Sequence, residues 1–149
     1  MNALFRDFQM AASAAQFARE IGFEPYDYQV AVLQSSAEQI ALNWCRQAGK
    51  STATSYIPVH HATFNPGSLT LILAPGERQA ILLLEKVYDV IAQMGKSAQP
   101  LETENTQYLK MENGSEIHAL PGKGDTIRGF SDVDLIVIDG ASRVPDPFY

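Results

Sequence analysis

Gly49, Lys50 and Ser51 have the types and the order of residues that could hold a phosphate group. In the motif G-x-x-x-x-G-K-[ST], backbone N–H groups and a helix N-terminus surround the phosphates, the lysine reaches the outer ones and the hydroxyl binds Mg²⁺. Trp44 stands where this motif begins with glycine, so the match is partial. On these residues alone, a turn at Gly49 followed by a solvated lysine at the start of a helix is an open alternative.

A second element that could act on phosphate lies far downstream. The four apolar residues from Leu135 to Ile138 predict a strand that places Asp139 at its end. In phosphate-loop enzymes an aspartate there belongs to the Mg²⁺ shell, opposite the hydroxyl of the loop. The two elements in this order are more specific than either alone. They predict that Lys50 and Asp139 converge on one magnesium-bound triphosphate.

The segments around these residues alternate between strand and helix patterns. An apolar run at 40–45 predicts a strand that leads into the loop. A helix is expected to begin near Lys50, with Pro58 as a kink or break. A buried strand is expected at 68–74 and an amphipathic helix at 77–95. This alternation is the signature of an α/β layer architecture.

The other segments have simpler patterns. Apolar residues at steps of three or four over 4–21 predict one or two helices, and 30–39 predicts another short helix. Residues 96–106 are polar and are expected to form a loop. Asn113-Gly114 lies between two segments able to pair, which is a strong hairpin signal.

Composition limits the class of protein. With 149 residues, 46% of them hydrophobic, the chain has the size and apolar content of one compact domain. Cys45 is the single cysteine and cannot form an internal disulfide, which favours a reducing compartment. A formal charge of −6 argues against this chain binding a nucleic-acid backbone by itself, because such binding depends on Lys and Arg. No apolar run reaches transmembrane length, and we expect neither export nor membrane association.

Several segments, taken in order, resemble the ATPase portion of the large subunit of phage terminases, the motors that drive double-stranded DNA into capsids. They are FAREIGFEPYDYQ, CRQAGKST, LILAPGERQA and IRGFSDVDLIVID with the following AS, from about Phe17 to Ser142. This family typically uses R-x-x-G-K-[ST], so Arg46 accounts for a loop without the first glycine. The resemblance implies a P-loop NTPase of the ASCE type, a three-layer α/β sandwich with a mainly parallel sheet. Residues 1–24 would form a helical lead-in and residues 25–149 the nucleotide-binding core.

The resemblance also implies roles for the matching residues, with ATP and Mg²⁺ as cofactors. Lys50 would contact the β- and γ-phosphates, and Ser51 would hold the metal together with Asp139. Arg46 would bind or sense the γ-phosphate, with a surface arginine as the alternative. The residues expected to contact the nucleotide are Tyr28, Gln29, Arg46, Gln47, Ala48, Gly49, Lys50, Ser51 and Thr52.

Two further roles concern the base and a neighbouring subunit. Tyr28 and Gln29 match the adenine-reading element of the family, since a glutamine amide can donate to and accept from the adenine edge. A helix-surface glutamine beside a core tyrosine is the alternative. Arg128 is the candidate arginine finger of a ring-shaped motor, where a fixed guanidinium can be worth about 10³ to 10⁵ in rate. Arg78 is a weaker competitor, and a helix-start arginine is its simpler interpretation.

The chain departs from the family pattern in two respects. Gly140 stands where the family has the glutamate that activates the attacking water, and loss of a general base typically costs about 10² to 10⁴ in rate. We therefore expect a chain that binds Mg-ATP and hydrolyses it very poorly. In these folds the strand between the loop strand and the Asp139 strand comes later in the sequence, followed by an RNase-H-like nuclease. With Tyr149 as the last residue, we expect an incomplete sheet and no nuclease domain, as in a fragment, a truncated product or a chain completed by a partner.

The resemblance implies an ATPase module that powers packaging of double-stranded DNA in the cytoplasm of a bacterial host. Its partners would be DNA, contacted through missing parts or the assembled ring, the portal protein, the small terminase subunit and further copies of itself. Two alternatives stay open. One is a superfamily 2 helicase-like ATPase, which shares a glutamine near adenine. The other is a nucleotide-binding or assembly module without catalysis, which Gly140 suggests.

Three weaker signals are interpreted structurally. His60 and His61 lack further ligands at metal-binding spacing, and we expect them to be helix-surface histidines. His118 lies in the expected hairpin without a visible nucleophile to serve. PGKGDT at 121–126 resembles the end of a phosphate loop, but it lacks a hydroxyl residue after Lys123 and is expected to be a flexible loop.

Overall fold

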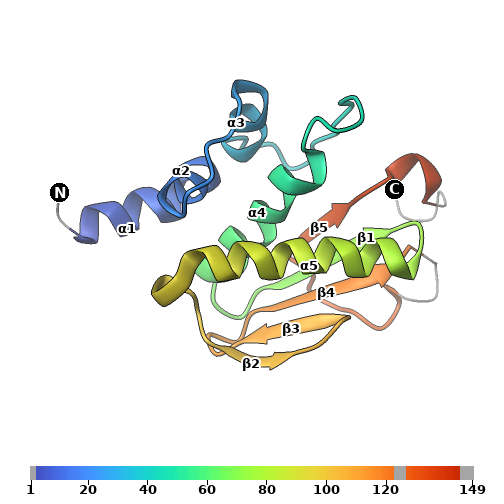
Figure 1. Ribbon diagram of the computed structural model, residues 1–149. Coiled ribbons are helices and arrows are strands. Elements are labelled where there is room, and N and C mark those ends of the chain that lie inside the picture. Colours follow the sequence, from blue (N-terminus) through green and yellow to red (C-terminus); the bar gives the residue numbers. More distant parts are fainter. Residues whose placement is uncertain (1–2, 123–126, 145–149) are drawn as a thin grey trace.

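The computed structural model describes residues 3–122 and 127–144 (Figure 1). Its first helices are α1 (Ala3–Ala12), α2 (Ala14–Glu20) and α3 (Asp27–Leu33). Ser13 separates α1 from α2 because its backbone is extended, and its hydroxyl accepts a hydrogen bond from the N–H of Gln16. The prediction of one or two helices over 4–21 is therefore confirmed, with two helices.

The rest of the chain forms a five-stranded sheet with two long helices. These elements are α4 (Lys50–Phe64), β1 (Leu69–Ala74), α5 (Glu77–Met94), β2 (Leu101–Glu104), β3 (Tyr108–Met111), β4 (Glu116–Pro121) and β5 (Leu135–Ile138), with short 3₁₀ turns at Gly95–Ser97 and Ala141–Arg143. The strand order is β2-β3-β4-β1-β5. β4, β1 and β5 are parallel, whereas β2 and β3 join as antiparallel strands. This α/β architecture with a parallel centre confirms the predicted fold class.

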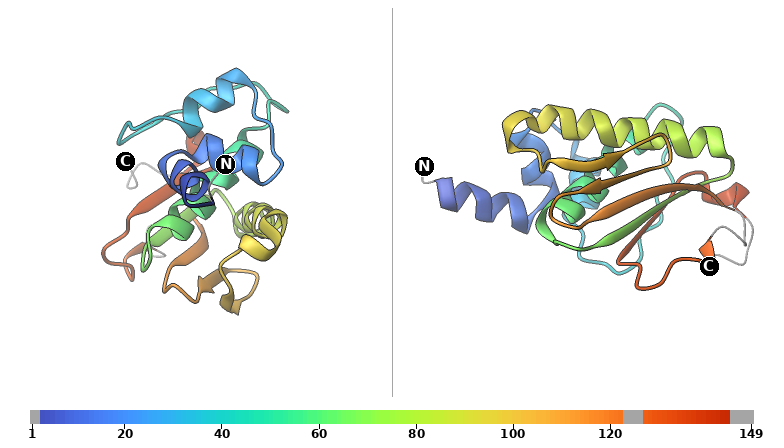
Figure 2. Two further views of the ribbon diagram at one scale, coloured as in Figure 1. Left: turned by 90° about the vertical axis from the view of Figure 1, so that its left-hand side faces the viewer. Right: turned by 90° about the horizontal axis from the view of Figure 1, so that it is seen from below.

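Among the described elements, α4 and α5 lie on one face of the sheet, as the end-on view of Figure 2 shows. Ile72, Ala119 and Val137 occupy matching register positions and pack into one apolar core with both helices. Leu71 and its register partner His118 directly precede Ile72 and Ala119 on their strands, and they therefore face the opposite side of the sheet. The helices α2 and α3 pack against α4, on the side away from the strands.

Helix α4 runs from Lys50 to Phe64 through Pro58, so of the predicted kink or break at this residue the break is wrong. Proline removes one helical hydrogen bond, but Tyr56, Pro58 and Val59 are all buried. Tertiary packing supplies most of the stability of helices in proteins, and here it outweighs the missing bond.

Three other segments differ from the sequence-based predictions. Helix α3 ends at Leu33, so the expected helix over 30–39 is wrong beyond its first residues. Residues 40–45 form no strand, because their backbone has no ladder partner among the described residues and β1 is already paired on both edges. The polar segment 96–106 contains β2, whose Leu101 and Thr103 are half-buried while the alternate glutamates are exposed. A short edge strand needs only this alternation, so its polar composition concealed it.

The expected hairpin is present between β3 and β4. Gly114 adopts φ 86°, which suits glycine, and the Asn113 side chain accepts a hydrogen bond from the N–H of Ser115 (3.0 Å). The same side chain donates to the carbonyl oxygen of Ala62 in α4 (2.8 Å). Asn113 thus forms the turn and fastens it to the helix layer.

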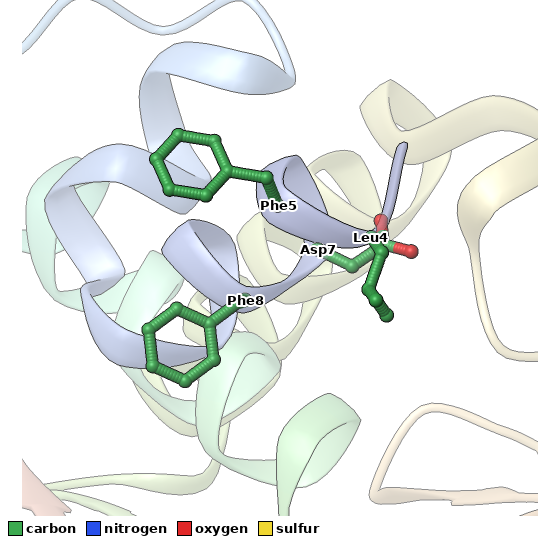
Figure 3. Close-up of a pocket in the computed structure, with 4 residues that line it drawn as sticks. All are labelled: Leu4, Phe5, Asp7 and Phe8. Atoms are coloured by element: carbon green, nitrogen blue, oxygen red, sulfur yellow. The ribbon is translucent and has the colours of Figure 1, made fainter. Parts of the chain in front are cut away.

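Helix α1 extends away from the body of the molecule (Figures 1 and 2). Leu4, Phe5 and Phe8 are exposed and, with Asp7, line a shallow hollow on this helix (Figure 3). This hollow is remote in sequence from the phosphate-binding motif. None of the described helices has the length and apolarity needed to cross a membrane.

Candidate nucleotide-binding site

The phosphate-loop motif forms a tight turn directly before α4. Gln47 and Gly49 have φ angles of 63° and 73°, and Gly49 is the last residue before the helix. The first N–H groups of a helix have no partner within the helix and carry a partial positive charge. The loop therefore delivers Lys50, Ser51 and Thr52 on the first turn of a fifteen-residue helix, where an anion is favoured.

Lys50 is turned toward its own loop. Its Nζ donates hydrogen bonds to the carbonyl oxygen of Trp44 and to that of Cys45, the latter at 3.1 Å. The residue that replaces the first glycine of the motif therefore contributes its backbone carbonyl to the loop. Lys50 thus closes the loop across six residues.

Gln29 and Tyr28 of α3 contact the loop at a different point. Nε2 of Gln29 and the hydroxyl of Tyr28 both donate to the carbonyl oxygen of Ala48, at 3.4 and 3.2 Å. Oε1 of Gln29 accepts a hydrogen bond from the N–H of Tyr26 (2.9 Å). Gln29 is only 3% exposed, so the alternative of a helix-surface glutamine is wrong.

An aromatic cluster adjoins the loop. Tyr26 and Tyr28 are stacked, with ring centroids 5.7 Å apart, and the Tyr28 ring meets Trp44 edge-on at 4.9 Å. Both tyrosines are exposed. The alternative of a core position for Tyr28 is therefore wrong, and its exposed ring lies beside the phosphate loop.

Asp139 follows β5 as predicted. Its N–H donates to the carbonyl oxygen of Leu73 (2.9 Å), which continues the β1–β5 ladder to the end of the strand. Asp134, at the other end, has a structural role, because its carboxylate accepts a hydrogen bond from the N–H of Leu69 (2.8 Å). Of the two aspartates, Asp139 stays the candidate metal ligand.

Gly140 adopts a conformation that favours glycine. Its φ is 66° and its ψ is 37°, in the left-handed region. A Cβ at this position would lie 3.1 Å from Cγ of Pro75 and 3.3 Å from Cδ. Glycine is thus favoured by the backbone here, and sequence reasoning, which considered only the absent carboxylate, missed this constraint.

The three candidate arginines are all at the surface. Arg46 lies in the turn of the loop, Arg78 is the second residue of α5 and Arg128 is in the turn at 127–129. Arg46 directly precedes Gln47, whose positive φ begins the tight turn of the loop. Arg128 is exposed, as a residue must be if its side chain is to reach another subunit.

The histidines have packing roles. His60 lies against the rings of Phe17 and Phe64, and its Nε2 is 2.9 Å from the carbonyl oxygen of Met10. Burial lowers the pKa of His60, and the hydrogen bond to Met10 opposes this effect. His60 is therefore a link between α4 and the first helices, and the prediction of a surface histidine is wrong.

His118 takes part in a stacked arrangement on the other face of the sheet. It stacks on Tyr108 at 5.0 Å, meets Phe130 edge-on and pairs with the carboxylate of Glu116 at 2.8 Å. Among residues 3–122 and 127–144, no cluster of three or more His, Cys, Asp or Glu could hold a metal ion. The PGKGDT segment falls largely outside the described residues.

The contact between Gln29 and the loop was missed by sequence reasoning. The spacing of Tyr26 and Gln29 carried a signal. A glutamine three residues after the N-cap residue of a helix often accepts a hydrogen bond from the backbone N–H of that N-cap residue. The partner at Ala48 lies nineteen residues away, and no local pattern indicates it.

Comparison with known proteins identifies the family. The family model described as the N-terminal part of T4-like-virus-type terminase large subunits matches residues 42–148, which is most of the chain. The chain belongs to this terminase family. The match includes the loop, Asp139 and Gly140.

Individual relatives agree with this membership. The large terminase subunits of Thermus phage G20c and Thermus virus P23-45 are each 24% identical to this terminase chain over 148 residues, covering 87% of it and 30% of their own length. Two solved structures of the large terminase ATPase domain of Thermus phage P74-26, one of a mutant, superpose with TM-scores of 0.77 and 0.72 at 22% and 25% identity. Each superposition covers 87% of this chain and 59% of the solved domain. The fold is that of a terminase ATPase domain, and the chain spans about a third of the curated relatives.

Proposed function

We propose that this chain is the ATP-binding and ATPase module of a phage terminase large subunit, and that it powers packaging of double-stranded DNA into the capsid. The observation that carries the proposal is the turn with Gly49 at φ 73° directly before α4, in a chain of the terminase family. The names of the relatives and of the solved ATPase domains support it. No feature of the described residues favours a helicase-like alternative.

The residues of the loop fit a nucleotide with Mg²⁺. The tight turn, the helix N-terminus and the Lys50 ammonium suit phosphate oxygens, while the Ser51 hydroxyl and the Asp139 carboxylate are oxygen ligands of the kind that Mg²⁺ prefers. When bound, Mg²⁺ supplies positive charge that offsets the charge developing on the transferred phosphate. In the proposal, Lys50 exchanges the carbonyls of Trp44 and Cys45 for the β- and γ-phosphates.

The remaining parts act partly within the chain and partly between subunits. Arg46 binds the γ-phosphate within the chain, and the exposed Arg128 reaches the nucleotide of a neighbouring copy in a ring. Residues 1–24 are a helical lead-in to the nucleotide-binding core at 25–149. The portal protein, the small terminase subunit and DNA are the proposed partners, in the cytoplasm of a bacterial host.

Gly140 favours a second candidate, a nucleotide-binding module with little or no hydrolysis. The family position of the catalytic glutamate is occupied here by a glycine in a left-handed conformation. Without a carboxylate to activate water, hydrolysis is expected to be slower by about 10² to 10⁴. The two candidates share the binding site and differ only in turnover.

Titration with a fluorescent ATP analogue and Mg²⁺ tests both candidates. Lys50→Ala should abolish binding, and Lys96→Ala, which removes an exposed lysine at the distant end of α5, is the matched control. Equal binding by the wild-type chain and Lys50→Ala would contradict the proposed site. A phosphate-release assay then separates a motor ATPase from a binding module.

A further inference from the structure

The amide of Gln29 is buried, and both of its ends are engaged by the chain. Oε1 accepts from the N–H of Tyr26 at 2.9 Å, and Nε2 donates to the carbonyl oxygen of Ala48 at 3.4 Å. The side chain is 3% exposed. A buried amide that turned toward another group would leave the N–H of Tyr26 or its own Nε2 without a partner, and each such loss is costly.

The backbone of the loop lies directly against this amide. A Cβ on Gly49 would stand 2.8 Å from Nε2 of Gln29, closer than real Cβ contacts come. Gly49 therefore meets two requirements, a left-handed φ of 73° and the absence of a side chain beside Gln29. Gln29 and Gly49 fit each other as a pair.

The hydrogen bond to Ala48 fixes the direction of the next N–H. Across a trans peptide, the carbonyl oxygen of one residue and the N–H of the following residue point in opposite directions. The described chain has no cis peptide bonds, so holding the Ala48 oxygen against Gln29 aims the Gly49 N–H away from Gln29. Tyr28, whose hydroxyl also donates to this oxygen, supports the same orientation.

We infer that Gln29 is a positioning residue of the phosphate loop, which fixes the Ala48–Gly49 peptide so that the Gly49 N–H faces bound phosphate whatever base the nucleotide carries. This inference rests on the proposed nucleotide site. It assigns the base-contacting surface to the exposed ring of Tyr28 with the half-buried Trp44 beside it, and it leaves the Gln29 amide to the loop.

The test compares three ligands that share phosphates and differ in the base. ATP, GTP and inorganic tripolyphosphate, each with Mg²⁺, are titrated by calorimetry and by the emission of Trp44, the single tryptophan of the chain. Gln29→Ala should weaken all three by roughly three- to tenfold, the effect of one hydrogen bond, with an unchanged ratio of ATP to GTP affinity. Gln34→Ala, at the exposed C-terminal end of α3, is the matched control and should change none of them.

A second variant covers the case in which Gln29→Ala does not fold, which a thermal melt reports. Tyr28→Phe keeps the aromatic ring and removes only the second donor to Ala48, at an exposed position. It should weaken the same three ligands equally, by a smaller factor. With either folded variant, loss for ATP alone, or unchanged affinity for tripolyphosphate, would overturn the inference. A wild-type chain that binds none of the three would instead refute the proposed function.

Discussion

Replacement of Gly140 by glutamate tests the reason for glycine at the position of the catalytic carboxylate. The backbone at Gly140 has φ 66°, and a left-handed conformation costs an ordinary L-residue about 1–2 kcal/mol. The new Cβ would also lie 3.1 Å from Cγ of Pro75, so the proline ring must shift. We expect the free energy of unfolding of Gly140→Glu to fall by about 1–2 kcal/mol, which lowers Tm by about 2 to 8 °C.

Gly140→Ala is the matched control for this substitution. Alanine has the same Cβ and the same left-handed backbone, and it has no carboxylate. Both variants should therefore lose similar stability, whereas only the glutamate can act as a general base. In a phosphate-release assay at equal protein and Mg-ATP concentrations, Gly140→Glu should exceed Gly140→Ala by about 10² to 10⁴.

Two results would refute this reasoning at different points. Equal turnover of the glutamate and alanine variants would show that a carboxylate at position 140 does not reach the attacking water. Unchanged stability of Gly140→Ala would show that the left-handed backbone and the contact with Pro75 carry no cost. The thermal melts and the hydrolysis assay thus examine the strain and the chemistry separately.

Three further predictions concern the core. The Thr70 hydroxyl is buried and has no hydrogen-bond partner among the described residues, so Thr70→Val should raise the free energy of unfolding by about 1 kcal/mol in urea denaturation; a loss of stability would contradict it. Tyr56 donates from its buried hydroxyl to the Gln93 side chain (2.8 Å), and Tyr56→Phe should cost about 1 kcal/mol in the same measurement, with an effect near zero arguing against this bond. Burial lowers the pKa of His60 below its ordinary 6.5, so the unfolded chain binds more protons between the two values. The free energy of unfolding should therefore fall as the pH drops through 6.5 toward the lowered pKa, and His60→Gln should lose this slope, which an identical pH profile of the two chains would disprove.

The sequence predicted the elements whose signals are local. The hairpin at Asn113-Gly114 follows from the turn preference of two adjacent residues, and the helix at 77–95 follows from its apolar period. β2 and the segment 40–45 were predicted wrongly for a common reason. A strand exists only where another strand supplies its hydrogen bonds, and which edge is free depends on the whole sheet.

The site divides in the same way. The sequence segments carried the resemblance to the family, which the match over residues 42–148 confirms. The sequence also placed Lys50, Ser51 and Asp139 at the ends of their elements, because these positions are fixed relative to a helix start or a strand end. Only the tertiary structure decided that the Gln29 amide lies against Ala48, that Lys50 folds back on the loop carbonyls and that Gly140 is held in a left-handed turn beside Pro75. The physical reason is that residue types and spacings are written along the chain, whereas the direction of a side chain and the space around it depend on segments that meet only when the chain folds.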